Sequence, residues 1–555
     1  MKDTLFPHTV TLAWFIPLVV VFLVVSGLIL RAVTAGRNVP AAWLFLLGGI
    51  AALARVPSVV YNGITNIDEA QTIAHALTLI RSPEPWKSID FTTNGPLNAY
   101  VFYIPYWLGL PLDYLVSHVI LLLLQALLAY TIFLTVRNWM GRDSAALTTI
   151  PVLAFIGFVQ QEDFIHQNSE TWCIVCLSAA LAVFSGLTVS GERRSTAKWF
   201  VVGLLLGAVP FGKPQGAPPA LMAALCMYIY VFVELRSRER LKALSALTAG
   251  GLTFLALFAG ITAYQGAAGD FYDLFIRANL HYASSFGNGF AFLPTFLWTW
   301  GLFSDVTALS VIIAAFTLFA LVRGGTVTGR QKIVGLMIAA IIFGGAYAVE
   351  RAGRHFYHYT LIFVYPGMFL LLGWCLKQLE TYRYRALLFS AGMLLFLSYI
   401  LYINRVVYGK VTDGFFSRES RKLDIKPVSK YVSQLLEPGD FLTVYGYYNE
   451  IYVETQFPSA TRTVTVYQHS VVWPELYLPY YCHDLFEKRP AVFVDALDTP
   501  HDFWQEHFVN RHAHSWEKIP EIREFIEQNY TMLKEIDKSR IYLRNDRLER
   551  SGQEN

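Results

Sequence analysis

Long apolar stretches recur along the first 403 residues, and they leave this part of the chain few choices other than a bundle of membrane-spanning helices. A helix of about 20 apolar residues is long enough to cross a bilayer. About twelve apolar stretches, a few of them shorter, lie at 14–30, 41–56, 114–136, 145–158, 172–187, 199–211, 217–233, 244–263, 306–322, 333–348, 361–376 and 386–403. The sequence therefore predicts a polytopic α-helical membrane domain of about 12 transmembrane helices over residues 1–403.

The remainder of the chain has a different composition. Although only 15% of all residues are charged, the last 152 residues contain 42 of the 85 charged side chains. Hydrophobic patterning in this part predicts helices at 428–436 and 519–529, and strands at 441–445, 491–495 and 540–543. Residues 404–555 are therefore expected to form a soluble α/β domain, which is large enough to fold as a unit.

The basic residues of the short loops predict the orientation of the membrane domain. One set of alternate loops contains 17 of the 25 Lys and Arg residues that precede residue 404, which predicts that this side faces the cytoplasm. The long loops 57–113 and 264–305 and the C-terminal domain would then lie in the periplasm or outside, beyond an inner (plasma) membrane. The net charge of +3 and the lack of a long basic run give no reason to expect nucleic-acid binding.

Acidic residues gather in the loops of the expected outer face. Asp68 and Glu69 precede a helical pattern at 71–80, and Asn66 with Glu69 is a capping pattern that by itself explains a helix start. Asp163 lies in a second acidic cluster, in the next loop on the same side. Acids at a bilayer surface are costly unless they are paired, metal-bound or functional, so both clusters are also candidates for chemistry.

Two polar residues precede an aromatic, amphipathic stretch at 98–108. Asp90 and Asn94 lie in the loop before it, and the length of the stretch suits a helix that lies on the membrane surface. These two residues are candidates for contacts with a substrate.

Few basic residues face the expected outer side, so each of them is informative. Lys213 follows a predicted helix, and Arg351 and Arg354 lie between two others. Such side chains often extend toward lipid head groups. Most basic residues lie on the expected cytoplasmic side, so a group of three on the opposite side also suggests an anionic ligand such as phosphate.

In this order along the chain, these features resemble the GT-C fold glycosyltransferases. The resemblance is closest to the bacterial relatives of protein O-mannosyltransferases and of lipid A aminoarabinose transferases. It is carried by Asp68-Glu69, Gly95-Pro96-Leu97, the acids of the second outer loop, Lys213-Pro214, the loop 354–359, the stretch 270–282 and the pattern 438–452. The chain departs from the aminoarabinose branch where that branch has Glu-Lys before a double proline, because Thr93-Asn94-Gly95-Pro96 stands there.

The resemblance implies transfer of a sugar from a polyprenyl-phosphate donor to a lipid, glycan or protein acceptor at the outer face, with inversion at the anomeric carbon. Asp68 would be the general base, and Glu69 and Asp163 would orient the acceptor or help to hold a divalent metal ion. The expected ligands of the donor phosphate are Lys213, Arg351 and Arg354. Asp90, Asn94, His355 and Tyr359 would contact the acceptor or substrate, and His281 is a candidate metal ligand.

Two other functions fit a chain of this kind. A lipid or sugar transporter (flippase) would also have about twelve helices, but its polar groups should lie near the middle of the bilayer, often in repeated halves. An O-antigen polymerase or ligase, which uses diphosphate-linked oligosaccharides, would equally use arginines in outer loops. The early Asp68-Glu69 pair favours the family that uses monophosphate-linked sugars.

Overall fold

The computed structural model describes residues 9–92, 94–160, 162–189, 194–285, 305–325, 328–351, 361–403, 422–498 and 511–553. By their internal contacts the residues form two compact units. Unit 1 comprises Met1–Tyr61, His118–Leu257 and Ala283–Arg418, and unit 2 comprises Asn62–Ser117, Phe258–Tyr282 and Glu419–Asn555. These units are defined by packing, so the division at residue 404 between a membrane domain and a soluble domain stays a prediction.

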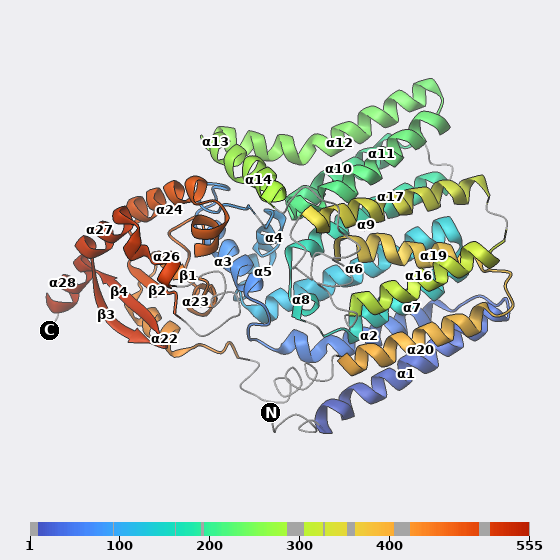
Figure 1. Cartoon of the computed structure of the whole chain (residues 1–555), viewed down its shortest axis with the longest axis horizontal. Coiled ribbons are helices and arrows are strands. Elements are labelled where there is room, and N and C mark those ends of the chain that lie inside the picture. Colours follow the sequence, from blue (N-terminus) through green and yellow to red (C-terminus); the bar gives the residue numbers. More distant parts are fainter. Residues whose placement is uncertain are drawn as a thin grey trace. The chain divides into compact units, whose positions relative to one another are not determined.

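Unit 1 is helical, and helices α1, α2, α7, α16, α19 and α20 pack against one another in it (Figure 1). Its helices are α1 (Thr9–Thr34), α2 (Ala41–Val60), α6 (Tyr114–Met140), α7 (Arg142–Phe158), α8 (Glu162–Ile165), α9 (Ser169–Val189), α10 (Thr196–Gly212), η2 (Pro214–Gly216), α11 (Ala217–Glu234), α12 (Ser237–Tyr264), α16 (Asp305–Arg323), α17 (Gly329–Arg351), α18 (Leu361–Phe363), η5 (Val364–Met368), α19 (Phe369–Gln378) and α20 (Arg385–Ile403). Helices α6 and α12 each extend into unit 2.

Each of the predicted apolar stretches coincides with helix in the structure. Among the described residues, 8 helices are long and apolar enough to cross a membrane, and Thr196–Gly212 and Ala308–Arg323 are shorter apolar helices. The protein is therefore a multi-pass helical membrane protein. The predicted number of about 12 spans is met only in part, because α7 has 17 residues and the predicted stretch 361–376 is divided by the π-helical turn η5.

Glycines allow two helices of unit 1 to approach very closely. A Cβ atom added at Gly203 or Gly207 of α10 would lie only 2.1 or 2.2 Å from backbone oxygens of α12. On the other side, a Cβ atom at Gly250 of α12 would lie 2.1 Å from the carbonyl oxygen of Phe200. Small residues at such a contact are typical of helix packing in membranes, where close backbone approach provides the attraction.

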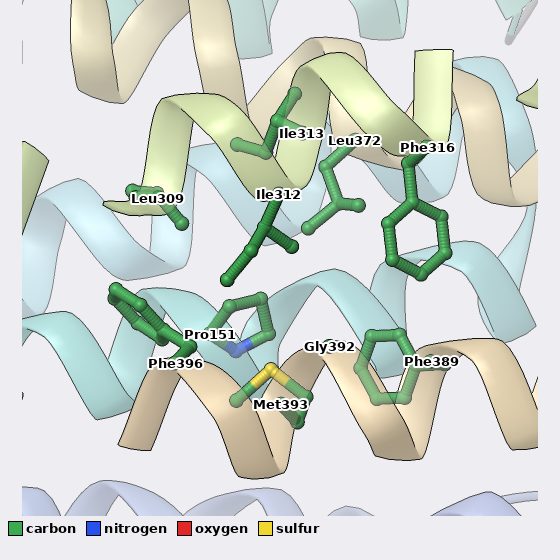
Figure 2. A pocket seen from close by; sticks show the side chains of 10 residues that line it. All are labelled: Pro151, Leu309, Ile312, Ile313, Phe316, Leu372, Phe389, Gly392, Met393 and Phe396. Carbon is green, nitrogen blue, oxygen red and sulfur yellow. The ribbon is translucent and has the colours of Figure 1, made fainter. Parts of the chain in front are cut away.

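A small apolar gap lies between α7, α16, α19 and α20 (Figure 2). The side chains around it include Pro151, Ile313, Phe316 and Met393, and no lining group is polar. Its volume of about 10 Å³ is at the lower limit for one water molecule, which would find no hydrogen-bond partner there. The gap is a packing feature of the bundle and has no room for a substrate.

Unit 2 combines short helices with a four-stranded sheet (Figure 1). The sheet order is β1-β2-β4-β3, with β1 parallel to β2 and the other neighbours antiparallel. Its elements are α3 (Ile67–Arg81), α4 (Leu97–Tyr100), α5 (Tyr103–Trp107), α13 (Ala268–Phe271), η3 (Tyr272–Arg277), α14 (Ala278–Ser285), α22 (Pro427–Leu435), β1 (Leu442–Gly446), α23 (Glu450–Thr455), η7 (Gln468–Val472), α24 (Pro474–Lys488), β2 (Val492–Ala496), α26 (Arg511–His514), η8 (Trp516–Lys518), α27 (Pro520–Asn529), β3 (Tyr530–Ile536), β4 (Ser539–Arg544) and α28 (Asn545–Gln553). The mixed α/β region that the sequence predicts is confirmed.

Alternate residues of the central strands face opposite sides of the sheet and build two cores. Val444 and Val494 pack with α22 and α23 on one side, whereas Tyr445 and Phe493 pack with α24 and α27 on the other. Ala74 of α3 belongs to the first core. Helix α3, which begins at the predicted acidic pair, is therefore packed firmly on the α/β region of unit 2.

The sequence did not predict strand β3. Most of its side chains are exposed, since it lies at the edge of the sheet and directly follows α27. The predicted surface helix at 98–108 is present as two short helices, α4 and α5, which leave Ile104, Trp107 and Leu108 largely exposed.

Candidate active site

The acidic pair Asp68-Glu69 lies in the first turn of α3. Asn66 is the N-cap, and its side-chain oxygen accepts a hydrogen bond of 2.9 Å from the backbone N–H of Asp68. The cap leaves the Asp68 carboxylate half-buried at the positive end of the helix dipole. The hydroxyl of Tyr447 donates to Oδ1 of Asp68 over 3.1 Å.

The backbone at the end of β1 explains why Tyr447 is available for this contact. Gly446 is the last residue of the strand, and a Cβ atom there would lie 2.9 Å from backbone atoms of Ala496 on β2. A glycine is thus needed where the chain leaves the sheet. The next residue, Tyr447, lies beyond the carboxyl end of a parallel strand, which is a common place for functional side chains in α/β sheets.

Glu69 is in a different environment from Asp68. Its side chain is fully buried, and it accepts hydrogen bonds from the hydroxyls of Ser117, over 2.6 Å, and Thr65, over 3.2 Å. Both of its carboxylate oxygens are therefore engaged within unit 2, and the residue is suited to fixing the start of α3.

Asp90 is buried in the loop before α4. Its Oδ1 accepts a hydrogen bond of 3.2 Å from the backbone N–H of Thr92, whereas its Oδ2 has no hydrogen-bond partner among the described residues. Burial raises the pKa of Asp90 to about 7, although the hydrogen bond from Thr92 and the charge of Arg462 act in the opposite direction. The carboxyl group therefore binds a proton far more readily than an exposed aspartate.

Asn94 lies against α3. Its Nδ2 is 3.5 Å from the hydroxyl of Thr72, which in turn donates to the carbonyl oxygen of Asp68 over 3.0 Å. The loop that contains Asn94 is thereby connected to the first turn of α3.

His281 packs against an aromatic ring. Its imidazole is stacked on Trp473 with a centroid distance of 4.0 Å, and the guanidinium of Arg277 lies 4.9 Å from the centroid of the same ring. Within the described ranges, no three His, Cys, Asp or Glu side chains are grouped so as to hold a metal ion. The residues described around His281 thus do not fit a metal centre.

Lys213, in unit 1, forms a buried ion pair. Its Nζ lies 2.7 Å from Oε1 of Glu170 and donates to the hydroxyl of Ser169 over 2.8 Å. The side chains of Lys213 and Glu170 are 4% and 1% exposed. Removing one partner of a buried ion pair strongly destabilises a folded protein, because the other charge is left buried alone. The contact with Glu170 therefore gives Lys213 a structural role.

Arg55 holds the segment that contains Asp163. It lies in α2, is 1% exposed, and donates to the carbonyl oxygens of Val159, over 3.2 Å, and Phe164, over 3.1 Å. Asp163 and Phe164 belong to the short helix α8. Arg55 thereby satisfies carbonyls at the end of α7 and within α8 and fixes the path of this loop.

Of the four residues predicted in and around the loop after α17, the structure describes one. Arg351 is the last residue of α17, with its guanidinium 5.6 Å from the ring centroid of Tyr347. Arg354, His355 and Tyr359 lie outside the described residues.

Sequence reasoning missed Arg55 and the contact of Tyr447 with Asp68. An arginine within an apolar, membrane-spanning helix is energetically costly and indicates a specific partner or function. Arg55 could therefore have been predicted from the sequence. The contact between Tyr447 and Asp68 gave no such indication, because it joins residues 379 positions apart.

A solved structure matches nearly the whole chain. ArnT from Cupriavidus metallidurans bound to undecaprenyl phosphate aligns with a TM-score of 0.55, over 91% of this chain and 98% of ArnT. The chain has the ArnT fold. The sequences are only 14% identical, so the match with ArnT confirms the GT-C fold that the sequence motifs indicated and does not extend to activity.

Two structures of the oligosaccharyltransferase of Archaeoglobus fulgidus are more distant than ArnT. AglB in complex with an inhibitory peptide and a dolichol-phosphate is 12% identical, with a TM-score of 0.47 over 82% of this chain and 70% of AglB. The complex with Zn and sulfate is also 12% identical, with a TM-score of 0.47 over 82% of this chain and 68% of its own. These scores are too low to support an argument about this chain. No protein-family model and no curated protein matches the sequence.

Proposed function

We propose that this protein is a membrane glycosyltransferase that takes a sugar from a polyprenyl-phosphate donor and transfers it to a hydroxyl acceptor. The ArnT fold and the undecaprenyl phosphate bound to ArnT support the class of donor. The observation that carries the proposal is the half-buried carboxylate of Asp68, which lies at a capped helix start and accepts a hydrogen bond from Tyr447. We further propose that the chain spans the membrane about twelve times, with this chemistry on the extracytoplasmic face.

The reaction is an inverting displacement. The acceptor oxygen forms a bond to the anomeric carbon while the bond from that carbon to the phosphate oxygen breaks, and the phosphate leaves with the electron pair. Asp68 accepts the proton of the acceptor hydroxyl, a role for which a positioned carboxylate contributes about 10²- to 10⁴-fold in rate. Tyr447 orients the Asp68 carboxylate, and buried Glu69 fixes the turn from which Asp68 projects.

Negative charge develops on the leaving phosphate, and preplaced cations stabilise it. We assign this role to Lys213, Arg351 and Arg354. Asp163 is assigned to acceptor orientation, with its loop held by Arg55. Asp90, Asn94, His355 and Tyr359 are assigned to substrate contacts, and no step in this mechanism depends on a metal ion.

The test compares lipids and surface glycans of cells that contain the wild-type protein, the Asp68→Asn variant or no protein, by mass spectrometry. We expect one sugar modification to be abundant with the wild type, reduced at least about 100-fold with Asp68→Asn and absent without the protein. A matched variant, Glu535→Gln on the exposed strand β3, should retain it. If Asp68→Asn retained the modification at the wild-type level, the assignment of the base would be wrong. If the profile were identical with and without the protein, transport of a lipid or sugar would become the better explanation.

A further inference from the structure

Unit 2 contains a polar cavity whose lining includes neither Asp68 nor Glu69. It has a volume of about 610 Å³, which is within the usual range for small-molecule sites. It lies between the loop 84–88, helix α13 and the C-terminal half of α24. The charged side chains around it include Glu84, Lys87, Asp270, Arg462, Asp484 and Lys488.

A buried ion pair makes the cavity rigid. Arg462 donates from Nε and Nη2 to the two carboxylate oxygens of Asp484, each over 2.8 Å, and its Nη1 donates to the carbonyl oxygen of Trp86 over 3.1 Å. Its Nη1 also lies 3.3 Å from Oδ2 of Asp270. Three segments that are distant in sequence are therefore fixed around one guanidinium, and the cavity is preformed.

Lys488 differs from the other charged groups of the lining. Its Nζ is inaccessible to solvent and has no hydrogen-bond partner among the described residues. The Nζ atom lies over the ring of Phe441, 5.6 Å from its centroid. Burial lowers the pKa of Lys488, although the charges of nearby acids, Asp484 foremost, act in the opposite direction, so the ammonium group is only partly compensated.

The acids of the lining compensate this ammonium group only in part. Asp270 and Asp484 are paired with Arg462, and Glu84 and Glu487 are 46% and 69% exposed, so that water screens their charge. The least screened charge without an ion-pair partner is therefore the ammonium group of Lys488. An anionic group of a ligand would satisfy it after a rotation of the flexible lysine side chain.

The remaining lining can accept a sugar ring. Tyr480 contributes an aromatic ring, which the guanidinium of Arg462 covers on one face at 4.6 Å from the centroid. The Tyr480 hydroxyl donates to Oδ2 of Asp273 over 3.3 Å. Pro479 extends this apolar surface, and the carboxylates of Asp270 and Glu487 offer acceptors for hydroxyl groups. An apolar face with a few fixed polar groups is typical of small-molecule sites.

We propose that this cavity binds a single sugar unit that bears a carboxylate or phosphate group, at a site separate from Asp68. The proposal does not rest on the proposed transferase activity. It concerns binding alone and holds equally for a protein that recognises acidic glycans or glycolipids without reacting with them at this site.

The experiment titrates the purified full-length protein in detergent with glucuronate, glucose 6-phosphate, glucose, glucosamine and inorganic phosphate, and measures binding by isothermal titration calorimetry. We expect glucuronate or glucose 6-phosphate to bind at least about tenfold more tightly than glucose, glucosamine or phosphate. Lys488→Met should weaken binding of the acidic sugar at least about tenfold, whereas Lys488→Arg should retain most of it. Lys430→Met, on the exposed side of α22, is the matched control and should bind normally.

Several results would overturn the proposal. They are equal affinities for glucuronate and glucose, a preference for glucosamine, phosphate binding as tight as that of glucose 6-phosphate, or unchanged affinity in a folded Lys488→Met variant. Asp68→Asn separates the two sites, because it should lower transfer at least about 100-fold and leave binding of the acidic sugar unchanged. If Asp68→Asn also removed that binding, the sugar would be bound at the transfer site and the separate cavity would have no role.

Discussion

The hydroxyl of Tyr447 donates a hydrogen bond of 3.1 Å to Oδ1 of Asp68. The tyrosine follows strand β1 and the aspartate begins helix α3, and both elements share a hydrophobic core through Ala74 and Val444. The α/β region thus contributes directly to the geometry of the residue that we assign as the general base.

Replacing Tyr447 by Phe should lower the turnover rate about 10- to 100-fold without unfolding the protein. A hydrogen bond to a charged group contributes about 1.5 to 3 kcal/mol, and here it holds the carboxylate in one orientation. The measurement is sugar transfer in proteoliposomes, with Tyr264→Phe, whose ring is almost fully exposed, as the matched control. In an Asp68→Asn background, Tyr447→Phe should cause no further loss, and additive losses would contradict a positioning role.

Lys213 is expected to have both a structural and a binding role. Lys213→Met alone leaves Glu170 buried without its cation and should destabilise the protein by about 3 to 5 kcal/mol. The double variant Lys213→Met/Glu170→Leu should recover most of this stability, as measured by thermal unfolding in detergent. If Lys213 also binds the donor phosphate, the stable double variant should bind undecaprenyl phosphate at least about tenfold more weakly. Wild-type affinity in that variant would leave Lys213 with the structural role alone.

Arg55 should be essential for the order of the loop that contains Asp163. Arg55→Met removes one donor each from the buried carbonyl oxygens of Val159 and Phe164, of which the second keeps a hydrogen bond from Gln125. It should cost about 1 to 3 kcal/mol of stability. Transfer activity should fall together with stability, as measured by melting temperature and turnover in the same preparation. Arg323→Met, at the end of α16, is the control, and an Arg55→Met protein with wild-type melting and turnover would contradict this role.

Asp90 should make stability decrease as the pH rises. Below pH 3.8 its carboxyl is protonated in the folded and unfolded chains alike, and between 3.8 and about 7 only the unfolded chain has lost the proton to a large extent. The folded state therefore loses stability across this range, at most on the order of 4 kcal/mol, and the loss levels off above pH 7. Asp90→Asn should raise the melting temperature relative to wild type more at pH 8 than at pH 4.5. An equal difference at the two pH values would show that Asp90 is not the group responsible.

The sequence predicted the helices of unit 1 because burial in lipid demands long apolar stretches, which are local in the chain. It also predicted Asp68 as the start of a helix, because Asn66 and Glu69 form a local capping pattern. Strands β1, β2 and β4 were predicted from short apolar runs, whereas β3 was not, since an exposed edge strand shows no such run.

The partners of the candidate site residues were not predictable from the sequence. Lys213 was expected to meet a phosphate, and the structure brings it to Glu170, an acid 43 residues earlier in the chain. Arg462 was overlooked because a lone arginine in a polar region looks solvent-exposed, although its side chain is 6% exposed. Such contacts depend on how distant segments pack, and no local pattern records them.

The guanidinium of Arg462 joins the backbone at Trp86, the side chain of Asp270 and the side chain of Asp484. Residues 404–555 fused alone to another membrane protein would therefore lack two of the segments that Arg462 contacts, the loop at Trp86 and the helix at Asp270. A functional chimera has to carry the loops 62–117 and 258–282 together with the C-terminal part. For the same reason, we expect substitutions in these three stretches of the chain to be correlated during evolution.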